Sequence, residues 1–444
     1  MPRHGANKKG PMSIQLINHK VYQPGDTILG MVTIKQGAKE KPVTNLALKL
    51  CCRAKVKIDK HDSNSRRIYR SRAFFLQTSE AVAVDSRNLD SEGNTCASFS
   101  VDIPAVPAKC PGSDVFDRSG DFRSNKGSPQ EELPGIFYLG SSRSFWAGVK
   151  QEAYIEYWLE AHSSLVSHPA TYPLFVRPRS AEKPTQDFNF LTKRYHVSLV
   201  SQRLQSEHAG TELTFRQKSR RFFTPGKVPK YTFRVMLSVP RTYQLEHPEP
   251  LPLKLWLNPI LNEKSITIYN GNLAALPPVT LRTVHASLKS TCEVRAPGTL
   301  TDHEASADSK HAQRRGISTT PNRAGPGQAL SIRVSHGGMS KQGSRRAATT
   351  AGEEKIYPSF ATYNIALSYR LSLKLHLICG GEERELEYAG PIELLAASEE
   401  QARAREEALG EEGMRRNYDG LDVALGTAGD VIEGLGDILE AALG

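Results

Sequence analysis

The sequence of 444 residues lacks long apolar runs. No stretch approaches the roughly 18 consecutive apolar residues that a membrane-spanning helix needs. The first 20 residues are basic and polar, and they contain no apolar core of the kind that a signal peptide carries. We therefore expect a protein that is neither integral to a membrane nor exported by a recognisable signal.

Cysteine is scarce and widely spaced. The six cysteines show neither the Cys-x-x-Cys spacing of a zinc site nor the density of a disulfide scaffold. This pattern predicts a reducing, intracellular compartment. In the adjacent pair Cys51-Cys52, Cys52 shares the apolar side of its segment with Leu50 and Ala54, which favours a buried structural thiol over a reactive one.

Short catalytic motifs are also absent. The sequence contains no P-loop, no GxGxxG after a strand, no HExxH and no GxSxG, which excludes the easily recognised nucleotide-binding, metalloprotease and serine-hydrolase classes. His196, His285 and His376 are isolated in the sequence, and each is expected to be a surface or hydrogen-bonded interior histidine. We expect a protein without catalytic residues, metal or cofactor; a β-sandwich enzyme would instead need a cluster of ionisable residues in one deep pocket.

Charge is unevenly distributed along the chain. The formal net charge is +11, from 58 Lys and Arg against 47 Asp and Glu. Residues 398–444 carry four basic and twelve acidic side chains, so this tail has a charge of −8 and the rest of the chain +19. Opposite charge blocks predict internal docking or two partners of opposite sign. The simpler alternative is a solvated basic surface with a solubilising tail.

Alternation of apolar and polar residues is the commonest pattern. From Leu46 to Ile58 every second residue is apolar while Lys49, Arg53, Lys55 and Lys57 occupy the other side, which predicts a half-buried strand. Similar segments recur up to residue 396 without long helical patterns between them. Strands that lack intervening helices cannot form βαβ units, so we predict an all-β fold of antiparallel sandwiches.

Composition divides the chain into two sandwich blocks with flanking segments. The polar, proline-containing stretch after residue 178 is typical of a linker. A Ser-, Thr-, Gly- and Arg-rich insert has too few large apolar residues to offset its ordering entropy, so we predict a disordered loop there. The predicted parts are a basic disordered N-terminus (1–11), a first sandwich (12–178), a linker (179–188), a second sandwich (189–396, with the insert at 296–355) and an acidic tail (397–444).

The tail carries a helical pattern. Its apolar residues are spaced alternately four and three apart, which predicts an acidic amphipathic helix over residues 418–443. Several glycines would weaken this helix in isolation, so we expect it to form on a partner surface. One hypothesis is that it docks on the basic body and is displaced by a ligand. The candidate docking face consists of Leu421, Leu425, Ile432, Leu435 and Leu439.

Two basic runs are candidate phosphate contacts, because guanidinium forks match phosphate geometry. Their ligands would be phosphorylated protein tails or phosphoinositide headgroups, and the alternative is that both runs are solvated loops. The first run is Arg66, Arg67, Arg70 and Arg72, and the second is Arg216, Lys218, Arg220 and Arg221. In the insert, Ser318 and Thr349 each follow an arginine by three residues, a spacing typical of basophilic kinase sites.

The first block resembles a known family. The segment Val21 to Ile34 reads VYQPGDTILGMVTI, and it resembles the Tyr-x-x-Gly-Asp-x-Ile-x-Gly-x-Val stretch that opens the N-terminal domain of arrestins, specifically the α-arrestin-like proteins of fungi. Four segments similar to later parts of that domain follow in order: LALKLCCRAKVKI (46–58), FSVDIP (99–104), LPGIF (133–137) and AYIEYWLEA (153–161).

The second block resembles the arrestin C-terminal domain. Three segments carry the similarity: VPR (239–241), LPLKLWL (251–257) and ATYNIALSYRLSLKLHLIC (361–379). The resemblance covers roughly residues 12–178 and 195–396, and it rests on an ordered set of strand patterns.

The resemblance implies two tandem immunoglobulin-like arrestin sandwiches and a non-enzymatic adaptor in membrane-protein trafficking. Such a protein binds transporters or receptors as cargo and links them to ubiquitin-dependent endocytosis or endosomal sorting, at the cytoplasmic side of the plasma membrane or of endosomes. Fungal α-arrestins recruit HECT-type ubiquitin ligases through Pro-Pro-x-Tyr, and this sequence departs from that pattern. Its one Pro-Pro pair, Pro277-Pro278, continues with Val279-Thr280, and Val228-Pro229-Lys230-Tyr231 is only a degenerate relative.

The strongly basic body leaves another class of function open. An electrostatic phosphoinositide-binding or nucleic-acid-binding protein would also be basic. The sequence contains no recognised nucleic-acid module and no interleaved aromatic and basic residues of the kind that form stacking platforms. Nucleic acid is therefore not the expected partner.

Overall fold

The computed structural model describes most of the two predicted sandwich blocks. Described residues are 11–17, 20–35, 45–62, 65–82, 89–90, 93–106, 133–144, 149–163, 166–205, 228–249, 251–261, 276–296, 306–307, 313–317, 322–324, 329–334, 356–362 and 364–404, with the single residues 212, 214, 215, 267 and 407. Nearly all of their regular structure is β-strand, which confirms the predicted all-β fold. No helix among them has the length and apolar character needed to cross a membrane.

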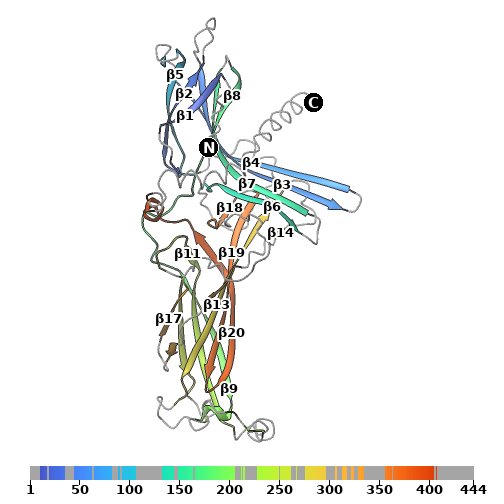
Figure 1. Cartoon of the computed structure of the whole chain (residues 1–444), viewed down its shortest axis with the longest axis vertical. Helices are drawn as coiled ribbons and strands as arrows, with labels where there is room; N and C mark the ends of the chain where they lie inside the picture. The colour runs from blue at the N-terminus through green and yellow to red at the C-terminus, as the bar shows by residue number, and fades with distance from the viewer. Residues whose placement is uncertain are drawn as a thin grey trace, which may run out of the picture.

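The first sandwich consists of a three-stranded and a five-stranded sheet (Figure 1). All of its strand pairs are antiparallel. The three-stranded sheet has the order β1 (Met12–Leu16), β2 (Thr27–Ile34) and β5 (Thr95–Asp102). The larger sheet has the order β4 (Ser65–Val82), β3 (Leu46–Asp62), β7 (Val149–Ser163) and β6 (Phe137–Ser144), and β8 (Val166–Leu174) also pairs with β7.

The second sandwich is likewise built from two sheets. One sheet has the order β17 (Ala329–Val334), β12 (Leu251–Pro259), β10 (Lys230–Pro240) and β9 (Phe190–Val200), and the 3-10 turn η4 (Gln202–Leu204) follows β9. The other has the order β11 (Thr242–Gln244), β20 (Glu382–Leu395), β19 (Ile365–Cys379), β13 (Val279–Val294) and β14 (Ser306–Ala307). Shorter strands β15 (Gln313–Ile317) and β16 (Asn322–Ala324) pair with β13, and β18 (Phe360–Ala361) pairs with β19.

One pair departs from the predicted antiparallel pattern. The short β11 runs parallel to β20. It follows β10 directly, after Arg241, but belongs to the opposite sheet, so the chain changes sheets at this corner. After this change of sheet, β11 lies beside β20 and runs in the same direction, so the pair is parallel.

Part of the insert pairs with the sheets. The strands β14 to β17 lie inside the predicted disordered loop and pair with β12 and β13. These segments are strands and not one continuous loop. The other insert residues lie outside the described residues, and disorder there stays a prediction.

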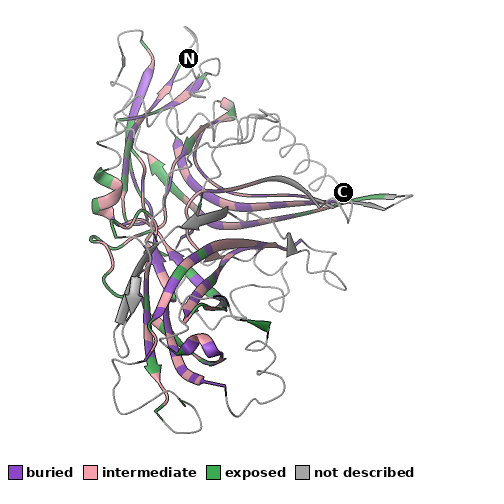
Figure 2. Cartoon of the chain, turned by 60° about the horizontal axis from the view of Figure 1, so that its bottom comes forward, coloured by how far each residue is buried: buried purple, intermediate pink, exposed green. Residues whose placement is uncertain are grey.

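Burial follows the alternation of the strands. Figure 2 shows buried and more exposed positions alternating along them. In the larger sheet of the first sandwich, Leu48, Leu50, Ile155 and Leu159 have no exposed surface. Burying such side chains away from water is the main favourable term in folding, so each sandwich is held together by the side chains between its sheets.

The motif at residues 21–34 forms a turn that leads into β2. Tyr22 is buried and bridges to Val176, and Gly25 has a φ of +97°, which glycine adopts without strain. At Gly30 an added Cβ would lie 2.6 Å from the carbonyl oxygen of Gln15. Both glycines of the motif are therefore required by the backbone.

The two sandwiches contact one another through polar and aromatic side chains. Asn364 Nδ2 donates to Ser71 Oγ at 3.0 Å, and both residues are buried. The Phe137 ring meets Tyr357 and Phe360 edge-on, with centroids 5.1 and 5.0 Å away. These contacts bring the end of the second sandwich against the sheet that carries β3 and β4.

Candidate anion-binding face

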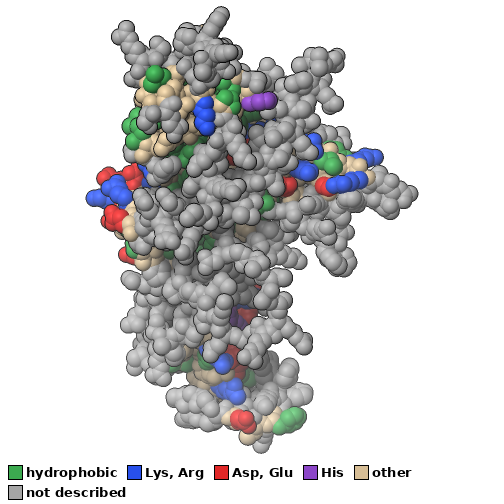
Figure 3. Space-filling view, turned by 45° about the horizontal axis from the view of Figure 1, so that its top comes forward, with side chains coloured by type: hydrophobic (Ala, Val, Ile, Leu, Met, Phe, Trp, Pro, Cys, Tyr) green, Lys and Arg blue, Asp and Glu red, His purple; other side chains and the backbone are tan. Residues whose placement is uncertain are grey.

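The first basic run lies on a long projecting ribbon. β3 and β4 pair along their whole lengths, from Leu46 opposite Val82 to Asp62 opposite Ser65. In Figure 1 these two strands extend together away from the body of the molecule. Figure 3 shows Lys and Arg side chains along the projecting part. The ribbon forms the edge of the larger sheet, in which β7 pairs with β3 as far as Lys60.

Strand alternation places cations on the outward side of this ribbon. Ala54 and Val56 are completely buried and Ile58 nearly so. Because successive side chains of a strand point to opposite faces, Lys55 and Lys57 lie on the other side, and both are half-buried. The apolar side holds the ribbon in the fold, and the polar side is left for contact with solvent or a ligand.

The register of the hairpin brings four cations together in two rows. Lys55 lies opposite Arg72, and Lys57 lies opposite Arg70. Directly opposite side chains have Cβ atoms about 5 Å apart, and like charges in that position repel. The two rows are two residues apart along the strand, or about 7 Å. We call Lys55, Lys57, Arg70 and Arg72 the cation rows.

The neighbouring strand β7 adds little opposing charge. Lys55 lies opposite Tyr154 on that side, with its Nζ 5.4 Å from the ring centroid. Lys57 lies opposite Glu152, the one carboxylate that β7 sets beside the rows. The face therefore keeps a positive balance.

Arg53 marks the end of this basic face. Its Nε donates to Glu156, and its guanidinium carbon lies 4.9 Å from the Trp158 ring centroid. Both carboxylate and aromatic ring engage the same cation. Beyond the cation rows toward the body, the face is thus neutralised within the sheet.

Arg66 is also engaged internally. Its Nε and Nη2 donate to Asp59 Oδ1 and Oδ2 at 3.0 and 2.6 Å, and Asp59 is buried. This bidentate hydrogen bond raises the pKa of the Arg66 guanidinium. The Arg66 fork is therefore bound within the ribbon, and we do not count Arg66 among the cation rows.

Arg67 lies on the other side of the ribbon. It pairs with Lys60 in the register, out of phase with Arg70 and Arg72. It is exposed, but it does not share a face with the cation rows. The sequence run of four arginines therefore divides: Arg70 and Arg72 lie opposite Lys57 and Lys55 on one face, and Arg67 lies on the other face.

The remaining predicted site residues lie outside the described residues. These are the second basic run (Arg216, Lys218, Arg220, Arg221), the tail docking face (Leu421, Leu425, Ile432, Leu435, Leu439) and the two candidate phosphosites (Ser318, Thr349).

The cysteines and histidines do not form a competing site. Every described cysteine is buried, and burial raises the pKa of the Cys51, Cys292 and Cys379 thiols to about 12, which suppresses thiolate chemistry. His285 and His376, distant in sequence, face each other with ring centroids 5.6 Å apart. Among the described residues no group of three or more potential ligands could hold a metal ion.

Comparison with known proteins adds no assignment. No protein-family model matches the chain, and no curated protein sequence matches it.

Proposed function

We propose that this protein is a non-enzymatic, arrestin-like adaptor that binds acidic or phosphorylated segments of membrane-protein cargo. It would act in the cytoplasm, peripherally at the plasma membrane or endosomes, and link its cargo to ubiquitin-dependent endocytosis or endosomal sorting. The observation that carries this proposal is the positive face formed by the cation rows on the β3–β4 ribbon. The ordered strand motifs and the two tandem sandwiches support it.

The chemistry of the rows suits anionic groups. Each row combines an arginine, whose planar fork bonds two oxygens at once, with a lysine, whose ammonium is a compact charge. An anion between the two would remove their mutual repulsion and gain charge-assisted hydrogen bonds. Each row is thus complementary to one phosphate or carboxylate group.

The spacing of the rows suits an extended peptide. In an extended strand the side chains at positions i and i+2 point the same way and lie about 7 Å apart. The rows have this same separation because they too are two residues apart on strands. We expect the strongest binding from a peptide with anionic residues at i and i+2.

Fluorescence anisotropy with the full chain tests this function. The probe is a labelled peptide with two phosphoserines separated by one residue. The variant K55A/K57A/R70A/R72A should bind at least about 10-fold more weakly, because hydrogen bonds to charged groups contribute about 1.5–3 kcal/mol each. The unphosphorylated peptide should bind neither protein.

A matched control separates the face from net charge. The variant K193A/R194A/K254A/R370A removes the same charge from exposed positions of the second sandwich, and it should bind within about twofold of the unaltered protein. Equal losses in both variants would contradict a defined face. Preference for bare duplex DNA, with a steep salt dependence, would instead favour the nucleic-acid alternative.

A further inference from the structure

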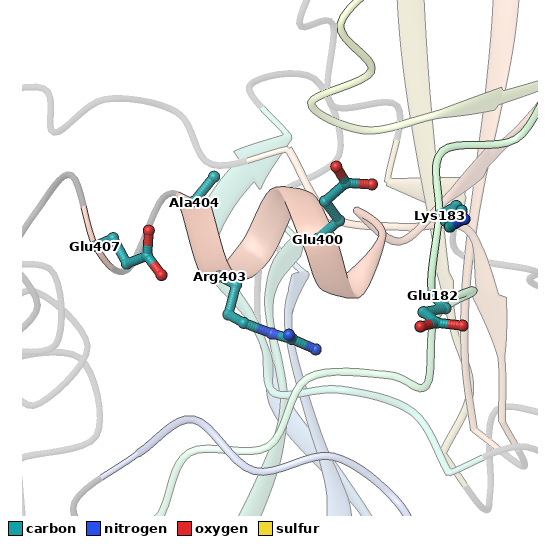
Figure 4. Close-up of a pocket in the computed structure, with 6 residues that line it drawn as sticks. All are labelled: Glu182, Lys183, Glu400, Arg403, Ala404 and Glu407. Carbon is teal, nitrogen blue, oxygen red and sulfur yellow. The ribbon is translucent and has the colours of Figure 1, made fainter.

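A short helix follows the last strand and meets the linker between the sandwiches. The described helical residues are 399–404 and 407. Figure 4 shows this helix beside the linker residues Glu182 and Lys183. We call residues 398–404 the latch segment; it precedes the amphipathic helix predicted at 418–443.

The latch segment begins with reciprocal hydrogen bonds. Ser398 N donates to Gln401 Oε1 at 2.8 Å, and Gln401 N donates to Ser398 Oγ at 3.2 Å. This arrangement is a capping box, which satisfies two backbone N–H groups at the start of a helix. Since Ser398 is fully buried, the cap fixes the point at which the tail leaves the second sandwich.

The first turn is bonded to the linker through the backbone. The first N–H groups of a helix have no partner within it. Here Glu399 N donates to Ala181 O at 3.0 Å, and Glu400 N donates to Glu182 O at 3.2 Å. The linker carbonyls thus accept the hydrogen bonds that the carbonyls of a preceding helical turn would otherwise accept.

Two side-chain contacts extend the latch segment to both sandwiches. Gln23 Nε2, in the connection between β1 and β2, donates to Glu399 Oε1 at 3.1 Å. Gln401 Nε2 donates to the carbonyl oxygen of Glu246, after β11. Glu246 has a φ of +59°, a conformation uncommon outside glycine. One helical turn therefore touches the first sandwich, the linker and the second sandwich.

No apolar face holds the latch segment in place. Its residues after the cap are Glu, Glu, Gln, Ala, Arg and Ala, so hydrogen bonds and not hydrophobic burial attach it. Beyond the first turn the helix and linker are separated by a cleft of about 370 Å³, lined by Glu182, Lys183, Glu400, Arg403, Ala404 and Glu407 (Figure 4). The latch segment therefore contributes little apolar surface of its own.

We infer that residues 398–404 are a releasable latch that fixes the relative orientation of the two sandwiches. While it is closed, the tail, the linker and both sandwiches are joined at one point. When it opens, the carbonyls of Ala181, Glu182 and Glu246 return to water. The first part of the linker then loses its tie to the tail, while Thr185 stays bonded to Gln244 and His247. This inference does not depend on the identity of the ligand of the cation rows.

Hydrogen exchange of the full chain tests whether the latch forms as described. The variant Q23A/Q401A removes the cap acceptor and both side-chain contacts. The amides of Glu399 and Glu400 should exchange at least about 10-fold faster in it, because the weakened latch segment leaves the carbonyls of Ala181 and Glu182 more often. The control variant is Arg403→Ala in the same helix, where Arg403 forms an exposed pair with Glu399 at 3.8 Å. In this control the amides of Glu399 and Glu400 should exchange at the original rate. Unchanged exchange in Q23A/Q401A would overturn the proposal.

Distances between the sandwiches test whether the latch fixes their orientation. One spin label is attached at Ser100→Cys in β5 and the other at Lys193→Cys in β9, so that each sandwich carries one probe at an exposed position. The labelled protein also carries Cys110→Ser. The distance distribution should broaden in Q23A/Q401A and not in Arg403→Ala, while the melting temperature of both stays within about 2 °C. Faster amide exchange with an unchanged distance distribution would show that the helix packs on the linker without fixing the relative orientation of the sandwiches.

Discussion

Two long antiparallel hairpins of this protein arrange their exposed charges in opposite ways. On β19–β20, Lys374 lies opposite Glu387, and its Nζ is 2.5 Å from Glu387 Oε1 and 3.0 Å from Glu385 Oε1. On β3–β4, lysines lie opposite arginines. Opposite charges across strands attract and like charges repel. The β19–β20 hairpin thus sets opposite charges across its strands, whereas the cation rows set like charges across theirs.

The pKa shifts of the charged residues on β19–β20 agree with the pairing of opposite charges there. Hydrogen bonds to Glu387 and Glu385 raise the pKa of Lys374, and the bond from Lys374 lowers the pKa of Glu385. Each partner favours the charged form of the other. We therefore regard this charge cluster as structural.

Reversing the charge of one strand should have the largest effect. The variant R70E/R72E gives β3–β4 the charge pattern of β19–β20, with each lysine opposite a glutamate. Binding of the doubly phosphorylated peptide should fall by at least about 30-fold, because both rows lose their fork and gain a repulsive carboxylate. Thermal unfolding should occur at the same or a higher temperature, since the cross-strand pairs become attractive.

The corresponding control exchanges the charges of the other hairpin. K374E/E387K keeps an opposite pair at the same place on β19–β20, and peptide affinity should stay within about twofold of the original value. Retained binding in R70E/R72E would contradict the assignment of the ligand site to the cation rows.

Deleting residues 418–444 should have an intermediate effect. This segment is acidic in sequence, and we propose that it competes with external anions for the basic body. Peptide affinity should then rise several-fold in the truncated chain, most strongly at low salt. The latch segment is retained in this variant, so its exchange should not change. An unaltered affinity would exclude the tail as a competitor.

Removing one carboxylate of β19–β20 should have the smallest effect. Glu385 has a lowered pKa in the fold, so its stabilising contribution is present above its unfolded pKa and is lost as pH falls through the folded value. Glu385→Gln should lower the melting temperature by about 1 °C at pH 7, and this difference should vanish once the pH has fallen below the folded pKa of Glu385. With Lys374→Gln already present, the added change should have a smaller effect, confined to the pair of Glu385 with His376.

The strands could be predicted because alternation is a local property. The 46–58 segment shows one apolar and one basic side in sequence, and its apolar side is buried as expected. The candidate site was only partly predictable. Arg70 and Arg72 stood out as members of a run, whereas Lys55 and Lys57 were noted only as the polar side of a strand. The proximity of the two lysines to the two arginines depends on the register of the hairpin. That register cannot be predicted when the turn between the strands is not identified in the sequence.

The helix after β20 was also only partly predictable from local sequence patterns. Apolar spacing points to residues 418–443, while the latch segment contains too few apolar residues to give a periodic pattern. Ser398 and Gln401 have the spacing of a capping box, but so short a pattern does not predict a helix by itself. The carbonyls that receive its first N–H groups belong to Ala181 and Glu182, more than 200 residues earlier in the chain, and no local pattern identifies them.

The sequence by itself determined that this chain forms β-sandwiches, because alternating burial fixes each strand residue by residue. It also determined which side of each strand is charged. The tertiary structure alone decided which charges meet: Lys57 with Arg70, Lys374 with Glu387, and Arg66 with Asp59. Those pairings depend on register and on contacts between distant segments, and electrostatic interactions depend on the separation of charges in space and not along the chain.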